Sequence, residues 1–441
     1  MSQILKPKKG YKSVPWLFGK EIKIPEEWEV KKCSKILELK HGYQFRDEDF
    51  IEGKKGIKII KIGNLKQNGS IDSNNCDIIS LDRKSDFLNI VINSGDVLMA
   101  LTGATLGKII QVPKINEILL QNYRVGNFFP KNDIDKNFLY CVLKNIFTQK
   151  QIWFLVNSGA QPNIGKEDFD KIKIICPPLS EQKQIAIILS NIDNLIESTD
   201  KVIENSKRVK TGLMQKLLIR GIGHTKFKKV PWLFGKEIEI PEEWESIILQ
   251  NISEHITKGT TPTTDGGKFM KKGILFIKVE SIDNVGNIQI EKCKFIDIET
   301  HEQLLRSQLV ENDILFSIAG TLGRVGLIKK DQTPSNTNQA ISIIRLKNQK
   351  FNLFYLFIFL RSIFIKKQIQ RLETVGAQPN LSLTQVNNFQ LFSPPLPEQQ
   401  KIATILSNMD SKITSQEQYK EKLEKLKKSL MQKLLTGEVR V

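Results

Sequence analysis

Apolar residues recur at steps of three and four along two long stretches, each of which follows a Pro-Pro pair, at Pro177 and Pro394. A carboxylate, Glu181 or Glu398, stands in the first turn of each stretch, where it suits a helix N-terminus. A sustained period of 3.5 residues is typical of a coiled-coil seam. The pattern therefore predicts two long helices that pair through Ile185, Ile188, Ile192, Leu195, Val202, Val209, Leu213, Ile402, Ile405, Met409, Leu423, Leu426 and Leu430.

The length of these helices indicates that each has a partner. About 38 residues at 1.5 Å each give roughly 57 Å, more than the width of a globule of about 150 residues. The other long helix is the obvious partner, and the alternative is a solitary amphipathic helix packed on its own globule. If the helices pair antiparallel, the two halves of the chain are related by a twofold axis, a symmetry that duplex DNA shares.

The rest of the chain mixes short β-rich runs with helical stretches near residues 136–156 and 353–372. This mixture predicts α/β or α+β globules of about 150 residues. The apolar run Phe351–Leu360 ends at Arg361 after ten residues, about half of what a bilayer requires, and therefore predicts a buried helix. The β-rich runs are GIKIIKI from Gly56, GDVLMAL from Gly95, GILFIKV from Gly273 and NDILFSI from Asn312.

The chain contains two copies of one sequence unit, an internal duplication. The sequence VPWLFGKEIKIPEEWE from Val14 returns from Val230 with fifteen of sixteen positions the same. Three further blocks recur at an offset of 217, namely GAQPN from Gly159, PPLSEQKQIAIILSNID from Pro177 in a similar form, and LMQKLL from Leu213. The expected organisation is a first globule at 14–178, a helix at 179–220, a linker at 221–241, a second globule at 242–395 and a helix at 396–436.

Composition favours a folded protein with a polyanionic partner. The 441 residues suit two domains plus connecting helices, and the formal net charge of +18 points to nucleic acid. A Lys-rich genome would produce the same charge without such a partner. The odd number of cysteines and the scattered histidines indicate neither a disulfide framework nor a zinc site, which fits a reducing cytoplasm. The N-terminal MSQILKPKKGYKS has no apolar core and does not predict a signal peptide.

The tandem globules, the Pro-Pro-Leu-x-Glu-Gln helix opening, the GAQPN block and the closing LMQKLL together resemble the specificity subunits of type I restriction-modification systems, over about residues 14–441. The IPEEWE segment and KGTTPT at Lys258–Thr263 add to the likeness. The first copy departs from the second motif and reads KHGYQF at Lys40–Phe45, which is expected if it recognises a different half-site.

The resemblance implies two pseudo-twofold-related target recognition domains, joined by two long antiparallel coiled-coil helices that set the gap between half-sites. Each domain would bind one half of a bipartite, asymmetric DNA site. The implied partners are double-stranded DNA, two methyltransferase (modification) subunits and, for cleavage, restriction (motor-nuclease) subunits, with no membrane. S-adenosylmethionine, ATP and magnesium are then expected on the partner subunits, with no cofactor bound by this chain.

Catalytic alternatives fit the sequence less well. Ser393–Pro395 looks like the start of an adenine methyltransferase motif, but Leu396 stands where an aromatic residue is needed, and no FxGxG cofactor loop occurs. Gly103–Lys108 (GATLGK) resembles a phosphate-binding loop, but it is one residue short and Ile109 replaces the magnesium-binding hydroxyl. No catalytic or metal-binding residue is therefore expected. A self-contained methyltransferase or nuclease and a stand-alone DNA-binding regulator remain the alternatives.

DNA-reading residues should lie where the two copies differ, because identical blocks cannot distinguish two half-sites. Side chains with donors and acceptors suited to base edges are the candidates. Gln161 and Gln378 of the shared GAQPN block are candidates for a contact that both copies make, such as one to phosphate, although packing at a turn would explain them equally well. The candidates in the divergent parts are Lys40, Tyr43, Arg46, Arg83, Lys84, Gln121, Arg124, Lys258, Thr260, Thr261, Thr263, Lys268, Arg324, Asn338 and Gln339.

Overall fold

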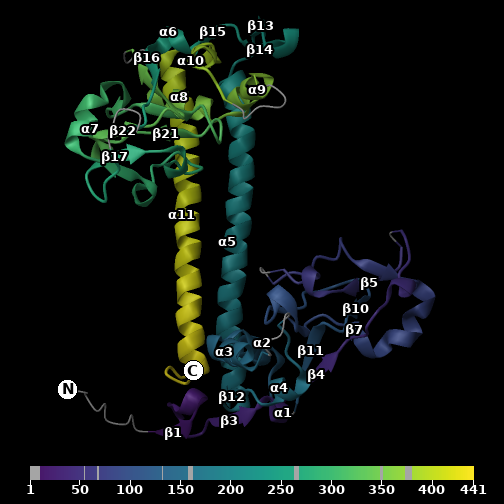
Figure 1. The fold of residues 1–441 in the computed structure, drawn as a ribbon. Coiled ribbons are helices and arrows are strands. Elements are labelled where there is room, and N and C mark those ends of the chain that lie inside the picture. Colours follow the sequence, from purple (N-terminus) through teal and green to yellow (C-terminus); the bar gives the residue numbers. More distant parts are fainter. Residues whose placement is uncertain are drawn as a thin grey trace, which may run out of the picture. The chain divides into compact units, whose positions relative to one another are not determined.

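The computed structural model describes residues 10–53, 55–66, 69–131, 133–156, 162–262, 268–347, 351–372 and 380–441. The chain divides into two units, of which unit 1 holds residues 1–200 and 418–441 and unit 2 holds residues 201–417. Each unit therefore combines one globule with parts of both long helices (Figure 1).

Unit 1 contains two four-stranded sheets, with strand orders β4-β11-β8-β9 and β6-β5-β10-β7, and the two-stranded sheets β1-β2 and β12-β3. All their pairings are antiparallel except that of β10 with β5. The strands are β1 Tyr11–Pro15, β2 Glu21–Pro25, β3 Glu29–Lys32, β4 Leu37–His41, β5 Ile57–Ile60, β6 Asp77–Ile79, β7 Val91–Ile92, β8 Val97–Ala100, β9 Ile109–Gln111, β10 Leu119–Gln121, β11 Val125–Pro130 and β12 Lys173–Cys176. The short helices are α1 Cys33–Ile36, α2 Lys136–Lys144, α3 Ile146–Leu155 and α4 Lys166–Asp170, and the long helix α5 spans Leu179–Arg220.

Unit 2 repeats this topology, with sheets β16-β23-β20-β21, β18-β17-β22-β19, β13-β14 and β15-β24, and again one parallel pair, β17 with β22. The strands are β13 Phe227–Pro231, β14 Glu237–Pro241, β15 Glu245–Ile248, β16 Ser253–Lys258, β17 Ile274–Ile277, β18 Lys294–Ile296, β19 Gln308–Leu309, β20 Ile314–Ser317, β21 Val325–Leu327, β22 Ser335–Thr337, β23 Ile341–Leu346 and β24 Gln390–Ser393. The helices are α6 Leu249–Ile252, α7 Ile298–Gln303, α8 Leu353–Leu360, α9 Ile363–Leu372, α10 Leu383–Asn387 and α11 Leu396–Leu435.

The four β-rich runs noted in the sequence form β5, β8, β17 and β20, so the predicted mixture of helix and sheet is confirmed. Each predicted helical stretch is divided into two helices. In unit 1 the side chain of Asn145 accepts a hydrogen bond from the backbone N–H of Phe147 and so begins α3 directly after α2. The apolar run Phe351–Leu360 contributes α8, most of which is buried. No helix in the described ranges is both long and apolar enough to cross a membrane.

The stretch 221–241, expected to be a linker, is largely structured and belongs to unit 2. Strands β13 and β14 form a hairpin, and Val230, Trp232 and Ile238 pack against the main hydrophobic core of that unit. Hairpin β1-β2 has the same role in unit 1, where Val14, Trp16 and Ile22 pack against the core. The near-identical sequence blocks are therefore folding elements of each globule.

The long helices pair antiparallel within each unit. In unit 1, Asp193 of α5 pairs with Lys427 of α11 and Asp200 pairs with Lys420. In unit 2, Lys210 pairs with Asp410 and Lys207 with Glu417. In both units the partner residue number falls as the α5 number rises, which only antiparallel helices allow.

The structure corrects half of the predicted pairing residues. Buried or half-buried positions follow alternating steps of four and three, so that the helices have a heptad seam, as predicted. Six of the thirteen predicted positions, however, lie one residue before the seam, and these residues are Ile188, Leu195, Val202 and Val209 in α5 and Ile405 and Leu426 in α11. The seam consists of Ile185, Leu189, Ile192, Ile196, Thr199, Ile203, Ser206, Lys210, Leu213 and Leu217 with Ile402, Leu406, Met409, Ile413, Gln416, Lys420, Leu423, Lys427, Leu430 and Leu434.

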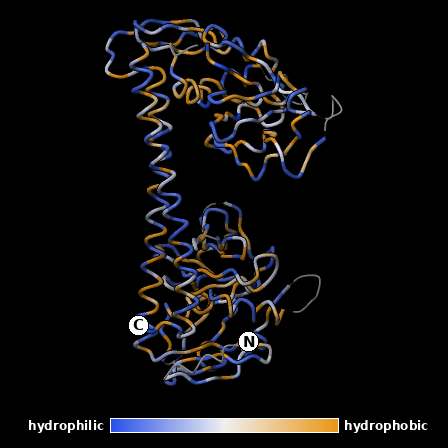
Figure 2. Tube along the Cα trace, turned by 90° about the vertical axis from the view of Figure 1, so that its left-hand side faces the viewer, coloured by the Kyte–Doolittle hydropathy of each residue, from blue (hydrophilic) through white to orange (hydrophobic). Residues whose placement is uncertain are grey.

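Five of these positions and Tyr419 form a second apolar stripe beside the seam, here called the flanking stripe: Leu195, Val202 and Val209 of α5 and Ile405, Tyr419 and Leu426 of α11. All six side chains are exposed. Figure 2 shows apolar residues recurring at short intervals along the long helix that ends at the label C. An apolar face wider than a two-stranded seam is typical of helices that pack in a larger bundle. The flanking stripe is thus surface that the pairing of α5 with α11 leaves exposed.

Each unit fixes a long helix to its globule through a glutamate in the first turn of that helix. In unit 1, Glu181 accepts a 2.9 Å hydrogen bond from Nε1 of the fully buried Trp28 and a bidentate pair from Arg440. In unit 2, Glu398 accepts a 2.9 Å bond from Nε1 of the fully buried Trp244 and a 2.8 Å bond from the backbone N–H of Ile222. The tryptophans belong to the repeated IPEEWE block, which explains why that block recurs.

We expect Glu398→Ala to destabilise the chain by about 2–4 kcal/mol, because it leaves the indole N–H of Trp244 and the N–H of Ile222 without acceptors. Urea unfolding of the full chain measures this loss. Glu421→Ala is the control, since that exposed carboxylate pairs with Lys425 one turn further along the same helix, where an ion pair contributes little. A midpoint that falls no further for Glu398→Ala than for the control would show that the glutamate is not an anchor.

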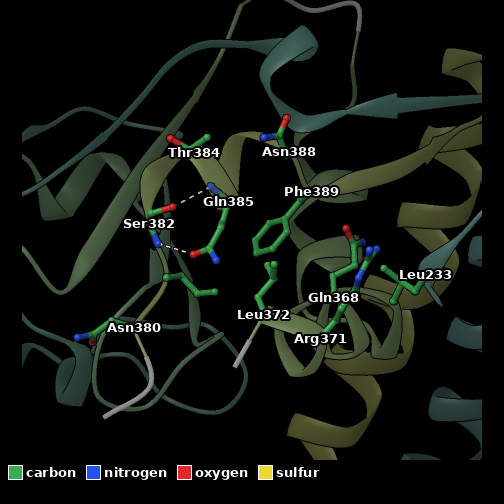
Figure 3. Close-up of a pocket in the computed structure, with 11 residues that line it drawn as sticks. Leu233, Gln368, Arg371, Leu372, Asn380, Ser382, Thr384, Gln385, Asn388 and Phe389 are labelled. Carbon is green, nitrogen blue, oxygen red and sulfur yellow. Dashed lines mark hydrogen bonds between the residues drawn. The ribbon is translucent and has the colours of Figure 1, made fainter. Parts of the chain in front are cut away.

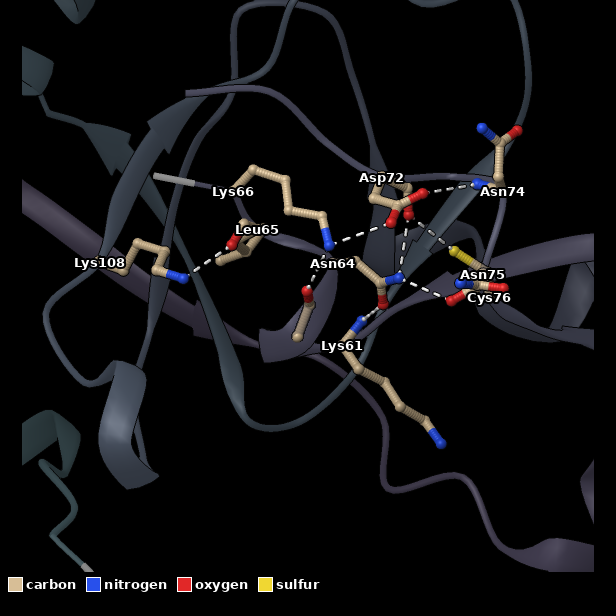
Figure 4. A network of polar contacts seen from close by, with 10 residues as sticks. Lys61, Asn64, Leu65, Lys66, Asp72, Asn74, Asn75, Cys76 and Lys108 are labelled. Carbon is tan, nitrogen blue, oxygen red and sulfur yellow. Dashed lines mark hydrogen bonds and ion pairs between the residues drawn. The ribbon is translucent and has the colours of Figure 1, made fainter. Parts of the chain in front are cut away.

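Polar loops of the globules are held by side-chain to backbone bonds. Asn64 donates to the carbonyls of Asp72 and Asn75, both at 2.9 Å, and accepts from the N–H of Lys61 at 2.8 Å (Figure 4). Lys108 donates to the carbonyl of Leu65 at 3.0 Å. The lysine of the GATLGK segment therefore ties two loops together, and Gly103–Thr105 forms a short 3₁₀ turn.

Candidate DNA interface

Two turns meet at the same place in each globule, and we call this feature the clasp. In unit 1 it joins Gly42–Gln44, after β4, to Asn122–Arg124, after β10. The N–H of Tyr43 donates to the carbonyl of Gln121 at 3.1 Å, and the N–H of Tyr123 donates to the carbonyl of Tyr43 at 2.9 Å. A Cβ atom on Gly42 would lie 1.9 Å from the carbonyl oxygen of Gln121, so only glycine permits this approach.

The clasp of unit 2 has the same backbone frame. It joins Gly259–Thr261, after β16, to Asn338–Ala340, after β22. The N–H of Thr260 donates to the carbonyl of Thr337 at 3.1 Å, and a Cβ atom on Gly259 would lie 2.1 Å from that oxygen. Because β10 pairs with β5 as β22 pairs with β17, Thr337 is the counterpart of Gln121. Asn338 then corresponds to Asn122.

The side chains on the two frames differ. In unit 1, Tyr43 is 46% exposed, and Gln44 and Arg124 are also exposed. Arg124 donates through Nε to the hydroxyl of Tyr123 at 2.7 Å. His41 lies beside them, with Nδ1 3.4 Å from the carbonyl oxygen of Tyr123. The first clasp thus carries a guanidinium, an amide, an imidazole and two phenol rings.

The second clasp carries hydroxyls and an amide in the corresponding places. Thr261 donates its hydroxyl to the side-chain oxygen of Gln339, which is exposed. Arg306, also exposed, donates to the hydroxyl of Thr260 at 3.0 Å. Lys258 is exposed directly before Gly259. Most of the groups on this clasp can donate or accept hydrogen bonds, but no aromatic side chain is among those described.

An aromatic cluster supports the first clasp. The Tyr43 ring lies 5.1 Å from the rings of both Phe45 and Phe87, and the guanidinium of Arg83 lies 5.1 Å from the centre of the Phe87 ring. Arg83 also pairs with Asp49 at 2.8 Å. A backbone hydrogen bond from Arg46, followed by the bond from Arg83, lowers the pKa of Asp49. Arg83 is therefore held in a fixed position beside the aromatic cluster, and Asp49 balances its charge.

The structure brings together some of the predicted residues and separates others. Tyr43 and Arg124 meet on the first clasp, and Thr260, Thr261, Asn338 and Gln339 meet on the second with Lys258 beside them. Three predicted residues lie elsewhere on the surface: Lys40 is over the Phe129 ring, Lys84 is on the 3₁₀ segment Leu81–Ile90, and Lys268 is exposed near β17. Arg46 remains exposed next to Asp49. Gln161, Thr263 and Gln378 lie outside the described residues.

Two predicted DNA readers have side chains that are engaged inside the protein. Gln121 is buried and donates to the carbonyls of Lys40 at 2.8 Å and Val125 at 2.7 Å. Arg324 donates to the carbonyls of Val279 and Ile282. Because Gln121 is buried, we correct its assignment from DNA contact to structural support. Arg324 is half-buried and supports two backbone carbonyls, and its predicted DNA contact stays a prediction.

Sequence reasoning missed four residues of the clasps. His41, Gln44 and Tyr123 adjoin predicted residues in the sequence, so the polar residues next to Gly42 and Asn122 could have been included. Arg306 could not have been found in this way, because its partner Thr260 is 46 positions away and only the fold brings them together.

A pocket of about 720 Å³ lies in unit 2 between α9, α10 and the turn that follows β13 (Figure 3). Arg371 is the one charged residue among the described residues that line it. Its guanidinium lies 5.6 Å from the centre of the exposed Phe234 ring. The described residues that line the pocket include no acidic residue, histidine or cysteine, the side chains that most often act as general acids and bases.

Several buried cysteine and aspartate side chains, which could act in catalysis, are instead protonated or ion-paired inside the protein. Burial raises the pKa of Cys141 and of Cys176 to about 12, so these thiols stay protonated at neutral pH. The buried Asp313 forms a bidentate pair with Arg345, at 2.7 Å for both bonds. Within the described residues no group of three or more His, Cys, Asp or Glu side chains is arranged to hold a metal ion.

Two globules of one topology, each displaying different polar side chains on the same frame, define a tandem recognition protein. The family model for the type I restriction modification DNA specificity domain matches residues 25–206 and 241–425. The chain belongs to this family of type I restriction-modification specificity subunits.

Individual relatives agree with this family. The chain is 28% identical over 440 residues to the type I restriction enzyme MjaVIII specificity subunit of Methanocaldococcus jannaschii, and the match covers 95% of both chains. It is 23% identical over 400 residues to the EcoBI specificity subunit of Escherichia coli, covering 86% of this chain and 79% of the relative.

Solved structures share the fold. The crystal structure of the type I restriction-modification S subunit from M. genitalium matches with a TM-score of 0.56 at 15% identity, covering 92% of this chain and 96% of that one. A chain from a study of complex assembly and conformational transition of the type I R-M system matches with a TM-score of 0.55 at 16% identity, covering 94% and 99%.

Proposed function

We propose that the chain binds a bipartite, asymmetric DNA site, one half-site per recognition domain, and directs partner subunits to that site. The observation that carries this proposal is the duplicated clasp, in which one backbone frame presents two different sets of polar side chains. A protein that read two identical half-sites would need no such difference. The net charge of +18 favours a polyanionic ligand.

Salt dependence tests this proposal with the purified chain. If six or more phosphates are neutralised on binding, affinity for duplex DNA should fall by about 10³-fold or more between about 50 and 200 mM salt. Titration of a labelled duplex at several salt concentrations measures the slope. A flat slope, or no binding of duplex DNA at low salt, would contradict the proposal.

The partners that we propose are two methyltransferase subunits and, for cleavage, restriction subunits. The flanking stripe supports this proposal, because exposed apolar residues at heptad spacing favour the docking of further helices. Both long helices carry the stripe, Val202 and Val209 on α5 corresponding to Tyr419 and Leu426 on α11. Two equivalent surfaces suit two copies of one partner.

We further propose that methyl transfer and DNA cleavage occur on those partners, which would bind S-adenosylmethionine, ATP and magnesium. Two observations on the methyltransferase-like and phosphate-loop-like segments support this. Ser393 ends β24 and Leu396 begins α11, so the Pro-Pro pair between them connects a strand to a helix. Lys108 is bonded to the carbonyl of Leu65. Both segments thus have structural roles.

A further inference from the structure

We infer that the clasp of each recognition domain reads bases, so that the side chains at positions 43, 44, 123 and 124 determine the first half-site and those at 260, 261 and 339 determine the second. This inference rests on the proposed function and specifies where on each domain the sequence is read. The ligand is the base edges of duplex DNA.

The frame of the clasp favours precise reading. Gly42 and Gly259 each allow two backbone segments to approach within a distance that no other residue permits. Asn122 and Asn338 close matching turns, since their carbonyls accept from the N–H groups of Val125 at 2.9 Å and Ile341 at 3.2 Å. Side chains that discriminate between bases must be held to within about 0.5 Å, and a turn that is hydrogen-bonded to a strand end provides such a support.

The two clasps diverge in their side chains, whereas the frame uses backbone groups and the shared glycine and asparagine. The glycine and the asparagine are the same in both copies, whereas Tyr123 and Arg124 correspond to Gln339 and Ala340. Arg124 and Gln339 are both exposed. Constant support beneath variable, exposed polar groups is what two readers of different sequences require.

The chemistry of the variable groups matches base edges. The guanidinium of an arginine such as Arg124 can bond both acceptors of a guanine in the major groove, and a glutamine such as Gln44 or Gln339 can bond both adenine positions. Threonine hydroxyls such as that of Thr261 can donate or accept. Exposed phenol rings such as that of Tyr43 add apolar contact with bases.

The test uses the full chain assembled with its methyltransferase, acting on a library of DNA duplexes, and sequences the methylated products. We expect Arg124→Ala to reduce discrimination at the first half-site about 10- to 100-fold and to leave the second half-site unchanged. Gln339→Ala should do the reverse. The double variant Tyr123→Gln with Arg124→Ala, which gives the first clasp the residues of the second at these two positions, should change the bases preferred in the first half-site.

Lys114→Ala and Lys329→Ala are the controls, because both lysines are exposed and each precedes strand β10 or β22 at the end away from the clasp. Unfolding midpoints equal to that of the unaltered chain verify that each variant folds. Equal loss of methylation on all sequences, with a shallower salt slope, would identify the clasp as a phosphate contact and overturn the inference. Failure of the unaltered complex to select any two-part site would instead refute the proposed function itself.

Discussion

The double variant Val202→Glu with Val209→Glu is expected to lose stable binding of a methyltransferase subunit to the long helices while remaining folded. The two valines are 44% and 52% exposed, so they are available to a partner and contribute little to the pairing of α5 with α11. Burial of a valine side chain contributes about 1.5–2 kcal/mol, and a buried carboxylate adds a further penalty. Two such changes should weaken binding by at least about 100-fold.

Gel filtration of the chain mixed with its methyltransferase measures this effect. The matched control is Thr211→Glu with Gln215→Glu, because these exposed residues lie on the side of α5 opposite the two valines. The control should form the complex, and helix content should stay constant in both double variants. If the variant with both Val202→Glu and Val209→Glu still forms the complex, the methyltransferase does not dock on the flanking stripe.

The period of the long helices could be predicted from the sequence, but only half of the pairing residues could be. Positions such as Ile185 and Ile192 belong to the seam as predicted. At every second core position of the heptad repeat, two neighbouring residues compete for the seam, and in several heptads both are apolar. In one heptad the two candidates are Val209 and Lys210. Hydrophobicity favours the valine, whereas the structure places the lysine in the seam, where it pairs with Asp410. The period of a pattern gives the spacing of the buried positions, but it does not determine which of two neighbouring residues is buried.

The clasp residues were predictable in part, because they lie where the sequences of the two copies differ. Tyr43 and Thr260 were predicted because they lie in divergent segments and carry groups suited to base edges. The roles of Gln121 and Arg324 could not be predicted, because an exposed amide or guanidinium and one that satisfies buried carbonyls look alike in a sequence. Contacts such as Arg306 with Thr260 depend on topology that repeats and periods do not determine.

Lengthening both long helices by one heptad should widen the gap between the half-sites and leave their bases unchanged. Because α5 and α11 pair antiparallel, the insertions must be matched, one between Asp200 and Lys201 and one between Glu417 and Gln418. Seven residues keep the seam in phase to within about 20° and add about 10.5 Å to the helices. At 3.4 Å per base pair this corresponds to about 3 bp. Some affinity should be lost, because the recognition domains also rotate around the duplex.

Genome-wide mapping of methylated adenines, in a strain whose only adenine methylation comes from this chain and its methyltransferase, tests the central claim most directly. For the unaltered chain we predict one asymmetric motif of two different half-sites separated by a fixed gap. For the lengthened chain we predict the same two half-sites with a gap about 3 bp longer. A continuous or palindromic motif, or a gap that stays the same while the recognised bases change, would contradict the assignment of one half-site to each domain and of the gap to the helices.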